Sequence, residues 1–167
     1  MTNRFRMVAG PNGSGKSTLA AWLTRDYAVN YLQDECINRG ISFSQETVFS
    51  HPSKVAALAK AKAAGFRTYL YFVATDSASV NAERVARRYA LGGHDVPQEK
   101  IVARYARSIA NVPAALPYLS RAFFFDNSGA EMRYLASYSE EVGLDLLVPE
   151  SDLPKWFMVA TSKEQQK

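Results

Sequence analysis

The chain has 167 residues, a formal net charge of +4 and 47% hydrophobic residues. This balance suits one domain with a substantial core and argues against intrinsic disorder. The single cysteine, Cys36, rules out an intramolecular disulfide and fits a reducing compartment, and no apolar run approaches the roughly 20 residues of a membrane span. We therefore expect a cytoplasmic protein with one domain over residues 1–161, a polar tail at 162–167 and no membrane partner.

The N-terminal region is typical of a strand, a glycine-rich turn and a helix in direct succession. Residues 5–9 form a short apolar run, and 10–15 are rich in glycine. Residues 17–25 then place Leu19 and Leu23 on one helical face. This order predicts a loop at the end of a buried strand, followed at once by a helix N-terminus.

The rest of the chain alternates between strand and helix patterns. Further strands are predicted at 29–32, 43–49, 68–74, 122–125 and 144–148, and further helices at 52–64, 79–91, 98–109 and 131–142. Regular alternation of this kind predicts an α/β fold, a mostly parallel sheet with helices on both faces.

A complete phosphate-binding motif occupies the glycine-rich turn. The pattern G-x-x-x-x-G-K-[ST] is matched by Gly10, Pro11, Asn12, Gly13, Ser14, Gly15, Lys16 and Ser17, with Thr18 next in the helix. Glycines let successive backbone N–H groups point at phosphates, and the following helix N-terminus favours anions. Lys16 is expected to reach the β- and γ-phosphates, and the Ser17 hydroxyl to ligate Mg²⁺. The sequence therefore predicts a P-loop NTPase fold that binds ATP with Mg²⁺.

Two acidic residues follow or end predicted strands, where folds of this kind place their chemistry. These are Asp34 and Glu46. A carboxylate there can accept the proton of an acceptor hydroxyl or join Mg²⁺ through water. Each residue also suits the simpler role of capping a loop.

A group of arginines lies on two consecutive predicted helices. Arg84 and Arg88 belong to the first, Arg104 and Arg107 to the second, and residues 92–97 with their Gly-Gly pair join the two. A mobile hairpin of this kind suits a lid that closes over ATP and excludes water. A solvated basic surface is the alternative interpretation.

Several motifs together resemble the zeta-toxin family of P-loop kinases, in particular its shorter bacterial branch. The matching segments cover most of the chain: AGPNGSGKST at 9–18, the acid at Asp34, FSQETVFSHPSK at 43–54, GFRTYLYFVAT at 65–75, RVARRYALGGHDVPQEKIVARYARSIAN at 84–111 and FFFDNSG at 123–129. Their order and spacing make the combination specific, whereas the phosphate loop alone would not be.

The resemblance implies a nucleotide-kinase-like sheet and phosphorylation of a hydroxyl of UDP-N-acetylglucosamine by ATP and Mg²⁺, under the control of an antitoxin protein. By position, Asp34 resembles the catalytic base of the family. Glu46, with Thr47, resembles its substrate-binding acid, and Arg84 an arginine that touches the ATP phosphates. Lys16 shares the catalytic role, and Arg88, Arg104 and Arg107 are candidate lid arginines.

Three interpretations of function remain open from the sequence. The first is an ATP-dependent kinase that acts on a small hydroxyl-bearing molecule such as a sugar nucleotide. The second, a nucleoside or nucleic-acid-end kinase, is favoured only by the net charge, and nucleic acid is not the expected partner. The third is a truncated relative that binds nucleotide without transfer, because only eight residues separate Asp34 from Phe43.

Overall fold

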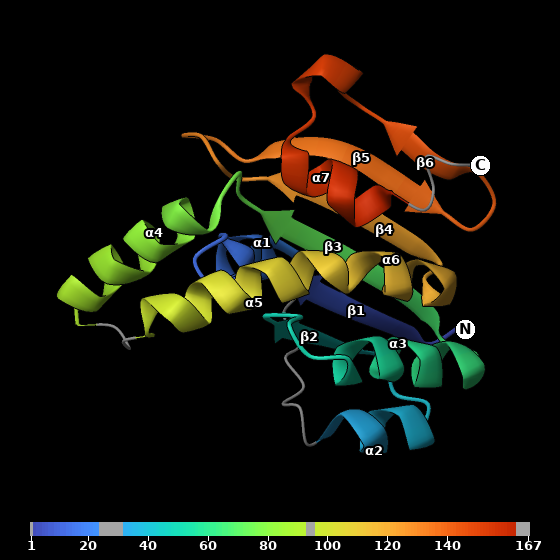
Figure 1. Ribbon diagram of the computed structural model, residues 1–167. Coiled ribbons are helices and arrows are strands. Elements are labelled where there is room, and N and C mark those ends of the chain that lie inside the picture. The colour runs from blue at the N-terminus through green and yellow to red at the C-terminus, as the bar shows by residue number, and fades with distance from the viewer. Residues whose placement is uncertain (1, 24–31, 93–95, 163–167) are drawn as a thin grey trace.

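The computed structural model describes residues 2–23, 32–92 and 96–162 (Figure 1). Its strands form one six-stranded sheet in the order β2-β1-β3-β4-β5-β6. The strands are β1 (Arg4–Ala9), β2 (Phe43–Thr47), β3 (Arg67–Ala74), β4 (Arg121–Asp126), β5 (Arg133–Ser139) and β6 (Gly143–Leu146). The first four are mutually parallel, whereas β5 and β6 continue the sheet in antiparallel pairing.

Helices cover both faces of this sheet, as the sequence predicted. The α-helices are α1 (Lys16–Leu23), α2 (Gln33–Asn38), α3 (Ser53–Ala63), α4 (Ala78–Ala90), α5 (Gln98–Ala110), α6 (Val112–Ala115) and α7 (Lys155–Thr161), with short 3-10 turns η2 (Leu116–Tyr118) and η3 (Glu150–Asp152). Figure 1 shows α3, α5, α6 and α7 on one face, α1 on the other, and α4 projecting beyond the sheet beside α5.

The side-chain alternation of β3 explains why the sheet needs two helical layers. Successive strand residues point to opposite faces. Leu70 and Phe72 are fully buried in the larger core, which includes Phe157 of α7. Val73 points the other way and packs against Leu19 of α1. The central strands are therefore buried on both sides, which parallel strands require.

The structure differs from the prediction in two elements near the C-terminus. Residues 131–142 were expected to be helical, but Arg133–Ser139 is strand β5. The open edge of β4 supplies its hydrogen-bonding partner, with Phe124 opposite Ala136, and Leu135 is fully buried. The second difference is α7, which the sequence analysis did not predict. Long-range pairing and burial, rather than local periodicity, determine both elements.

Other predictions concern residues that are not described. The strand predicted at 29–32 lies outside the described residues except for Leu32, which precedes α2. Residues 93–95 of the predicted hinge and 163–167 of the polar tail also lie outside them. None of the described helices is long and apolar enough to cross a membrane.

Candidate active site

The phosphate loop runs from the end of β1 into α1 and is packed tightly against the sheet. Gly10 has a φ of +145°, and a Cβ atom there would lie 1.9 Å from the carbonyl oxygen of Val73. No side chain fits at that distance, so glycine is required where the loop leaves the sheet. Since β1 lies between β2 and β3, the loop opens near the middle of the parallel part of the sheet.

Lys16 is held inside the loop that it belongs to. Its side chain is only 7% exposed, and Nζ donates a 2.8 Å hydrogen bond to the carbonyl oxygen of Pro11. Burial lowers the pKa of Lys16 from 10.5 to about 8, because desolvation disfavours the charged amine. Glu46 partly opposes this effect and Arg88 adds to it. A phosphate bound beside this buried amine would favour its charged form again, because an opposite charge raises the pKa of an amine.

Ser17 and Glu46 bring two oxygen donors together at the mouth of the loop. Ser17 Oγ donates a 2.9 Å hydrogen bond to Glu46 Oε1. The parallel register of β1 with β2 explains their proximity, because Val8 lies opposite Glu46 and Ala9 opposite Thr47. Glu46 therefore lies at the end of β2 beside the start of the loop, within reach of Ser17 in the first turn of α1.

The donor set fits a magnesium ion that keeps most of its ligands from water and phosphate. Mg²⁺ prefers oxygen ligands and binds through one or two protein groups in sites of this kind. No group of three or more His, Cys, Asp or Glu residues suited to a metal occurs in the described part of the chain. Within the same residues, Asn12 Oδ1 and Ser14 Oγ are buried without a hydrogen-bond partner. Unpaired polar atoms in the loop fit a site built for a ligand.

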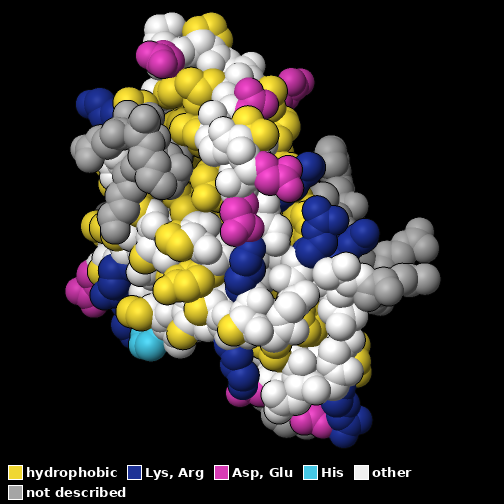
Figure 2. Space-filling model, turned by 90° about the vertical axis from the view of Figure 1, so that its right-hand side faces the viewer, with side chains coloured by type: hydrophobic (Ala, Val, Ile, Leu, Met, Phe, Trp, Pro, Cys, Tyr) yellow, Lys and Arg dark blue, Asp and Glu magenta, His cyan; other side chains and the backbone are white. Residues whose placement is uncertain are grey.

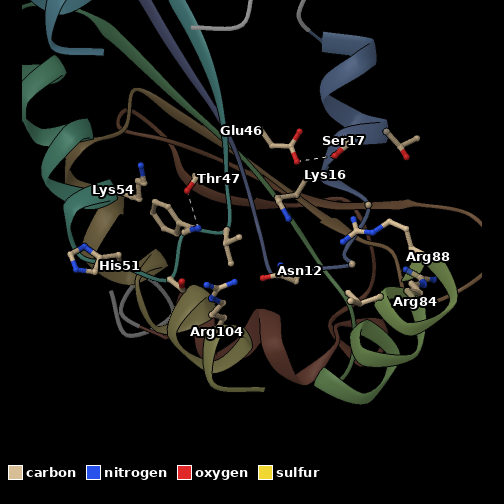
Figure 3. Close-up of a pocket in the computed structure, with 17 residues that line it drawn as sticks. Asn12, Lys16, Ser17, Glu46, Thr47, His51, Lys54, Arg84, Arg88 and Arg104 are labelled. Carbon is tan, nitrogen blue, oxygen red and sulfur yellow. Dashed lines mark hydrogen bonds between the residues drawn. The ribbon is translucent and has the colours of Figure 1, made fainter. Parts of the chain in front are cut away.

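A cavity of about 710 Å³ opens beside the loop (Figure 3). Arg84 and Arg88 of α4 approach it from one side, and Arg104 of α5 from below in this view. Its lining comprises Asn12, Gly13, Gly15, Lys16, Ser17, Thr18, Glu46, Thr47, Val48, Phe49, Ser50, His51, Lys54, Arg84, Val85, Arg88 and Arg104. Five cationic side chains and one carboxylate thus surround a single cavity, which favours anionic ligands.

Helix α5 fixes the wall opposite α4 by holding the segment that follows β2. Ser108 Oγ donates to the carbonyl oxygen of Val48 at 2.6 Å, and Asn111 Nδ2 to that of Phe49 at 2.8 Å. Phe49 is fully buried and has a φ of +64°, an uncommon conformation for a residue with a side chain. This turn directs the chain into α3, which carries Lys54 into the cavity wall. Burial lowers the pKa of Lys54.

The structure brings most of the predicted site residues to one cavity, but of those outside the phosphate loop it leaves out Asp34 and Arg107. Arg107 is exposed and does not line the cavity. Asp34 was expected at the end of a strand beside the loop, yet it lies in the first turn of α2 and is exposed. Its Oδ1 is 2.9 Å from Lys60 Nζ on α3. Lys60 lies six residues after Lys54, about 9 Å further along the helix, so the partner of Asp34 lies outside the cavity.

Two cavity residues were missed as candidates, namely His51 and Lys54. Both lie in the segment 43–54, in which the sequence analysis named only Glu46 and Thr47 as candidates. The available signal was their position just after a strand that ends beside the phosphate loop, because such strand ends face the ligand in parallel sheets.

On the face shown in Figure 2, basic and acidic side chains are intermingled among the coloured atoms. Lys62 and Glu140 form one ion pair between α3 and the end of β5. A mixed surface of this kind lacks the continuous positive stripe that usually follows a nucleic-acid backbone. This face, at the end of the sheet where β1 begins, therefore carries no such stripe.

The strand order and the phosphate loop after β1 define an α/β fold of the P-loop NTPase type. A chain of the AvrRxo1-ORF1:-ORF2 complex, solved with ATP, superposes with a TM-score of 0.65 at 12% identity over 87% of this chain. This chain spans 61% of the length of that one. A chain of the PezAT toxin-antitoxin system of Streptococcus pneumoniae superposes with a TM-score of 0.57 at 10% identity, covering 99% of this chain and 82% of its own.

Sequence comparison adds less than the fold does. No protein-family model matches the chain. An uncharacterized protein of Haemophilus influenzae is 24% identical over a 132-residue alignment that covers 63% of this chain and 94% of that protein. The comparisons therefore establish the fold and leave the reaction to be argued from the site.

Proposed function

We propose that the protein is an ATP-dependent kinase that transfers the γ-phosphate to a hydroxyl group of a small molecule. The observation that carries this proposal is the single cavity in which the phosphate loop, the Glu46 carboxylate and the arginines of α4 face one another. Phosphoryl transfer depends mainly on positioning and on cations placed around the migrating group. Lys16, Arg84 and Arg88 supply those cations on the donor side of the cavity.

The ATP base and its phosphates would occupy two adjoining regions. The triphosphate would lie along the loop. Ser17, together with water, would hold Mg²⁺, which would screen the phosphate charge. A second cavity of about 590 Å³ begins beside Thr18 and is lined mainly by apolar groups, including Leu19, Phe125, Met132 and Tyr134. An apolar pocket with aromatic walls suits a purine ring. We assign the adenine to this pocket.

The acceptor would enter the opposite end of the first cavity. Thr47, His51, Lys54 and Arg104 lie toward that end, and Glu46 lies beside the loop at Ser17 (Figure 3). Cationic groups beyond the reach of the phosphate loop favour an acceptor that carries phosphate of its own. A sugar nucleotide combines such phosphate with free hydroxyls, so UDP-N-acetylglucosamine remains our candidate acceptor.

We propose Glu46 as the group that accepts the acceptor proton. Its Oε1 receives the Ser17 hydrogen bond, which holds the carboxylate beside the phosphate loop and in the wall of the cavity. As the bond between the γ-phosphorus and the ADP oxygen breaks, a new bond forms to the acceptor oxygen, and the hydroxyl proton moves to Glu46. General-base assistance of this kind is worth on the order of 10²–10⁴ in rate. Asp34, the base expected from the resemblance, has no comparable contact with the cavity.

An antitoxin is the partner that we propose for the protein. Support comes from the fold, which is shared with a chain of a toxin-antitoxin system. The test is co-expression with the neighbouring open reading frame, followed by size-exclusion chromatography of the purified chain. Elution of both proteins as one complex would support the proposal, and separate elution would count against it.

The decisive experiment for the kinase activity is transfer of γ-³²P from ATP to a panel of sugar nucleotides, nucleosides and nucleic-acid ends. We expect one acceptor class to be labelled by the wild type and not by Lys16→Ala. The position of Asp34 outside the cavity favours a second candidate, a nucleotide-binding protein without transfer. ATP binding by calorimetry with no labelled acceptor would select this second function.

A further inference from the structure

Asn127, in the turn after β4, contacts the phosphate loop from the side opposite Glu46. Its Nδ2 donates a 2.9 Å hydrogen bond to the carbonyl oxygen of Ser14, although the two residues lie 113 positions apart. A Cβ atom on Gly15, whose φ is +96°, would meet the same Nδ2 at 2.3 Å. The amide therefore occupies the space that a side chain on the loop would fill.

The backbone of Asn127 also anchors an arginine of the proposed lid. Arg84 Nη1 donates a 2.7 Å hydrogen bond to the carbonyl oxygen of Asn127, and Nη2 lies 3.5 Å from that of Gly129. Arg84 and the loop residues Gly15 and Lys16 line the same cavity. One residue thus contacts two groups that must act on the same phosphates.

Neighbouring contacts hold Asn127 in a fixed position. Its backbone N–H donates a 2.8 Å hydrogen bond to the carbonyl oxygen of Ala74, at the end of β3. The preceding residue, Asp126, is 5% exposed, and its carboxylate accepts hydrogen bonds from Trp156 Nε1 at 3.1 Å and Ser128 Oγ at 2.7 Å. The turn is therefore tied to β3 on one side and to α7 on the other. A group held this firmly can transmit position from one contact to the other.

We infer that Asn127 is a positioning residue which couples the phosphate loop to Arg84, so that both reach the ATP phosphates in register. This inference rests on the proposed use of the cavity for ATP. The side chain sets the loop through Ser14, and the carbonyl group sets the guanidinium. Loss of the side-chain amide frees the loop from the arginine and weakens recognition of the phosphates more than recognition of the base.

The test is a double-mutant cycle on ATP affinity, measured by calorimetry, with Asn127→Ala, Arg84→Ala and the double variant. The lost hydrogen bond is worth roughly 3–10-fold in ATP affinity. Coupling requires that Arg84→Ala cost less in the Asn127→Ala background than in the wild type, since contacting residues deviate from additivity. Additive effects of the two changes would overturn the inference.

Two further measurements separate positioning from a merely structural role. Asn127 also lines the pocket assigned to adenine, so Asn127→Ala should weaken adenosine binding to some extent. ATP affinity should fall by a larger factor, because adenosine lacks the phosphates that the loop and Arg84 hold. The isosteric Asn127→Asp should weaken ATP binding at least as much, since a carboxylate oxygen would then face the Ser14 carbonyl. Equal losses for ATP and adenosine would overturn the inference by showing general damage to the fold.

Thr68→Val is the matched control. Thr68 Oγ1 donates a 2.6 Å hydrogen bond to the carbonyl oxygen of Tyr118, at the far end of β3 from the loop. This variant loses that bond and the one that Thr68 Oγ1 accepts from the Ser120 N–H at 3.2 Å. It should therefore lower the unfolding temperature without changing the ratio of ATP to adenosine affinity. A wild type that binds ATP but phosphorylates nothing would refute the kinase proposal and leave this cycle measurable, whereas a wild type that binds no ATP would overturn both.

Discussion

Ser17 donates a hydrogen bond to Glu46 across 2.9 Å, and this contact joins the phosphate loop to the acceptor end of the cavity. The two residues lie 29 positions apart and meet only because β1 and β2 pair in parallel register. The carboxylate is therefore placed where it could contact both substrates of a transfer reaction.

Replacement of Glu46 by glutamine should reduce phosphoryl transfer by on the order of 10²–10⁴-fold while ATP affinity changes little. Glutamine keeps the shape of the side chain but accepts no proton. Steady-state kinetics with the labelled acceptor measures the effect. Asp34→Asn is the companion variant, and it should retain transfer because Asp34 is paired with Lys60 outside the cavity. Loss of transfer in Asp34→Asn with normal transfer in Glu46→Gln would reverse the two roles.

Replacement of Lys16 by methionine should abolish ATP binding and stabilise the ligand-free protein. The pKa of Lys16 in the folded protein, about 8, lies below its ordinary value of 10.5. Charging this buried amine therefore opposes folding at pH 7, by about 3 kcal/mol from the size of the shift. Thermal unfolding without nucleotide should show a higher midpoint for Lys16→Met, together with no ATP-induced shift. A lower midpoint would mean that the hydrogen bond to Pro11 outweighs the cost of burial.

ATP affinity should be nearly constant from pH 6.5 to 7.5 and fall as the pH rises above about 8. The ligand-free protein loses the Lys16 proton near pH 8, whereas bound phosphate would raise the pKa of the same amine. Binding then requires uptake of a proton and weakens by up to about tenfold per pH unit. Calorimetry across this range is the measurement, with Lys16→Arg as the control that stays charged. A wild-type profile as flat as that of the control would contradict the assigned pKa.

Arg104 and Arg107 form a natural pair for testing the cavity wall, because they lie on the same helix. Arg104 lines the cavity and Arg107 does not. Arg104→Ala should raise the KM for an anionic acceptor by roughly 10-fold or more, as expected for loss of a charge-assisted hydrogen bond. Arg107→Ala should leave it unchanged. Equal effects of the two substitutions would argue for a general surface charge rather than a specific contact.

The helical hairpin of α4 and α5 should become protected when nucleotide binds. Arg84 and Arg88 lie on α4, and Gly92, with a φ of +88° and open space around it, follows that helix. Hydrogen exchange with and without a non-hydrolysable ATP analogue tests the prediction that this region closes as a lid. Slower exchange in α4 with unchanged exchange in α7 is the expected result. Unchanged exchange in α4 at saturating analogue would refute it.

The sequence alone determined the parts of the protein that depend on local chemistry. The phosphate loop was identified from its glycines, Lys16 and Ser17, because close backbone approach to phosphate allows few other residues. Strands such as β3 and helices such as α5 were predicted near their observed bounds, since their hydrophobic periods are regular. The parallel sheet followed from the alternation of these elements.

Tertiary structure decided what depends on pairing between distant segments. The local pattern of residues 131–142 predicts a helix, but pairing with the free edge of β4 makes Arg133–Ser139 a strand. Asp34 lies in α2 and pairs with Lys60 outside the cavity, and no sequence spacing reveals that pair. Asn127 contacts Ser14, which lies 113 positions before it, and Arg84, which lies 43 positions before it. Only the assembled sheet brings these three residues together.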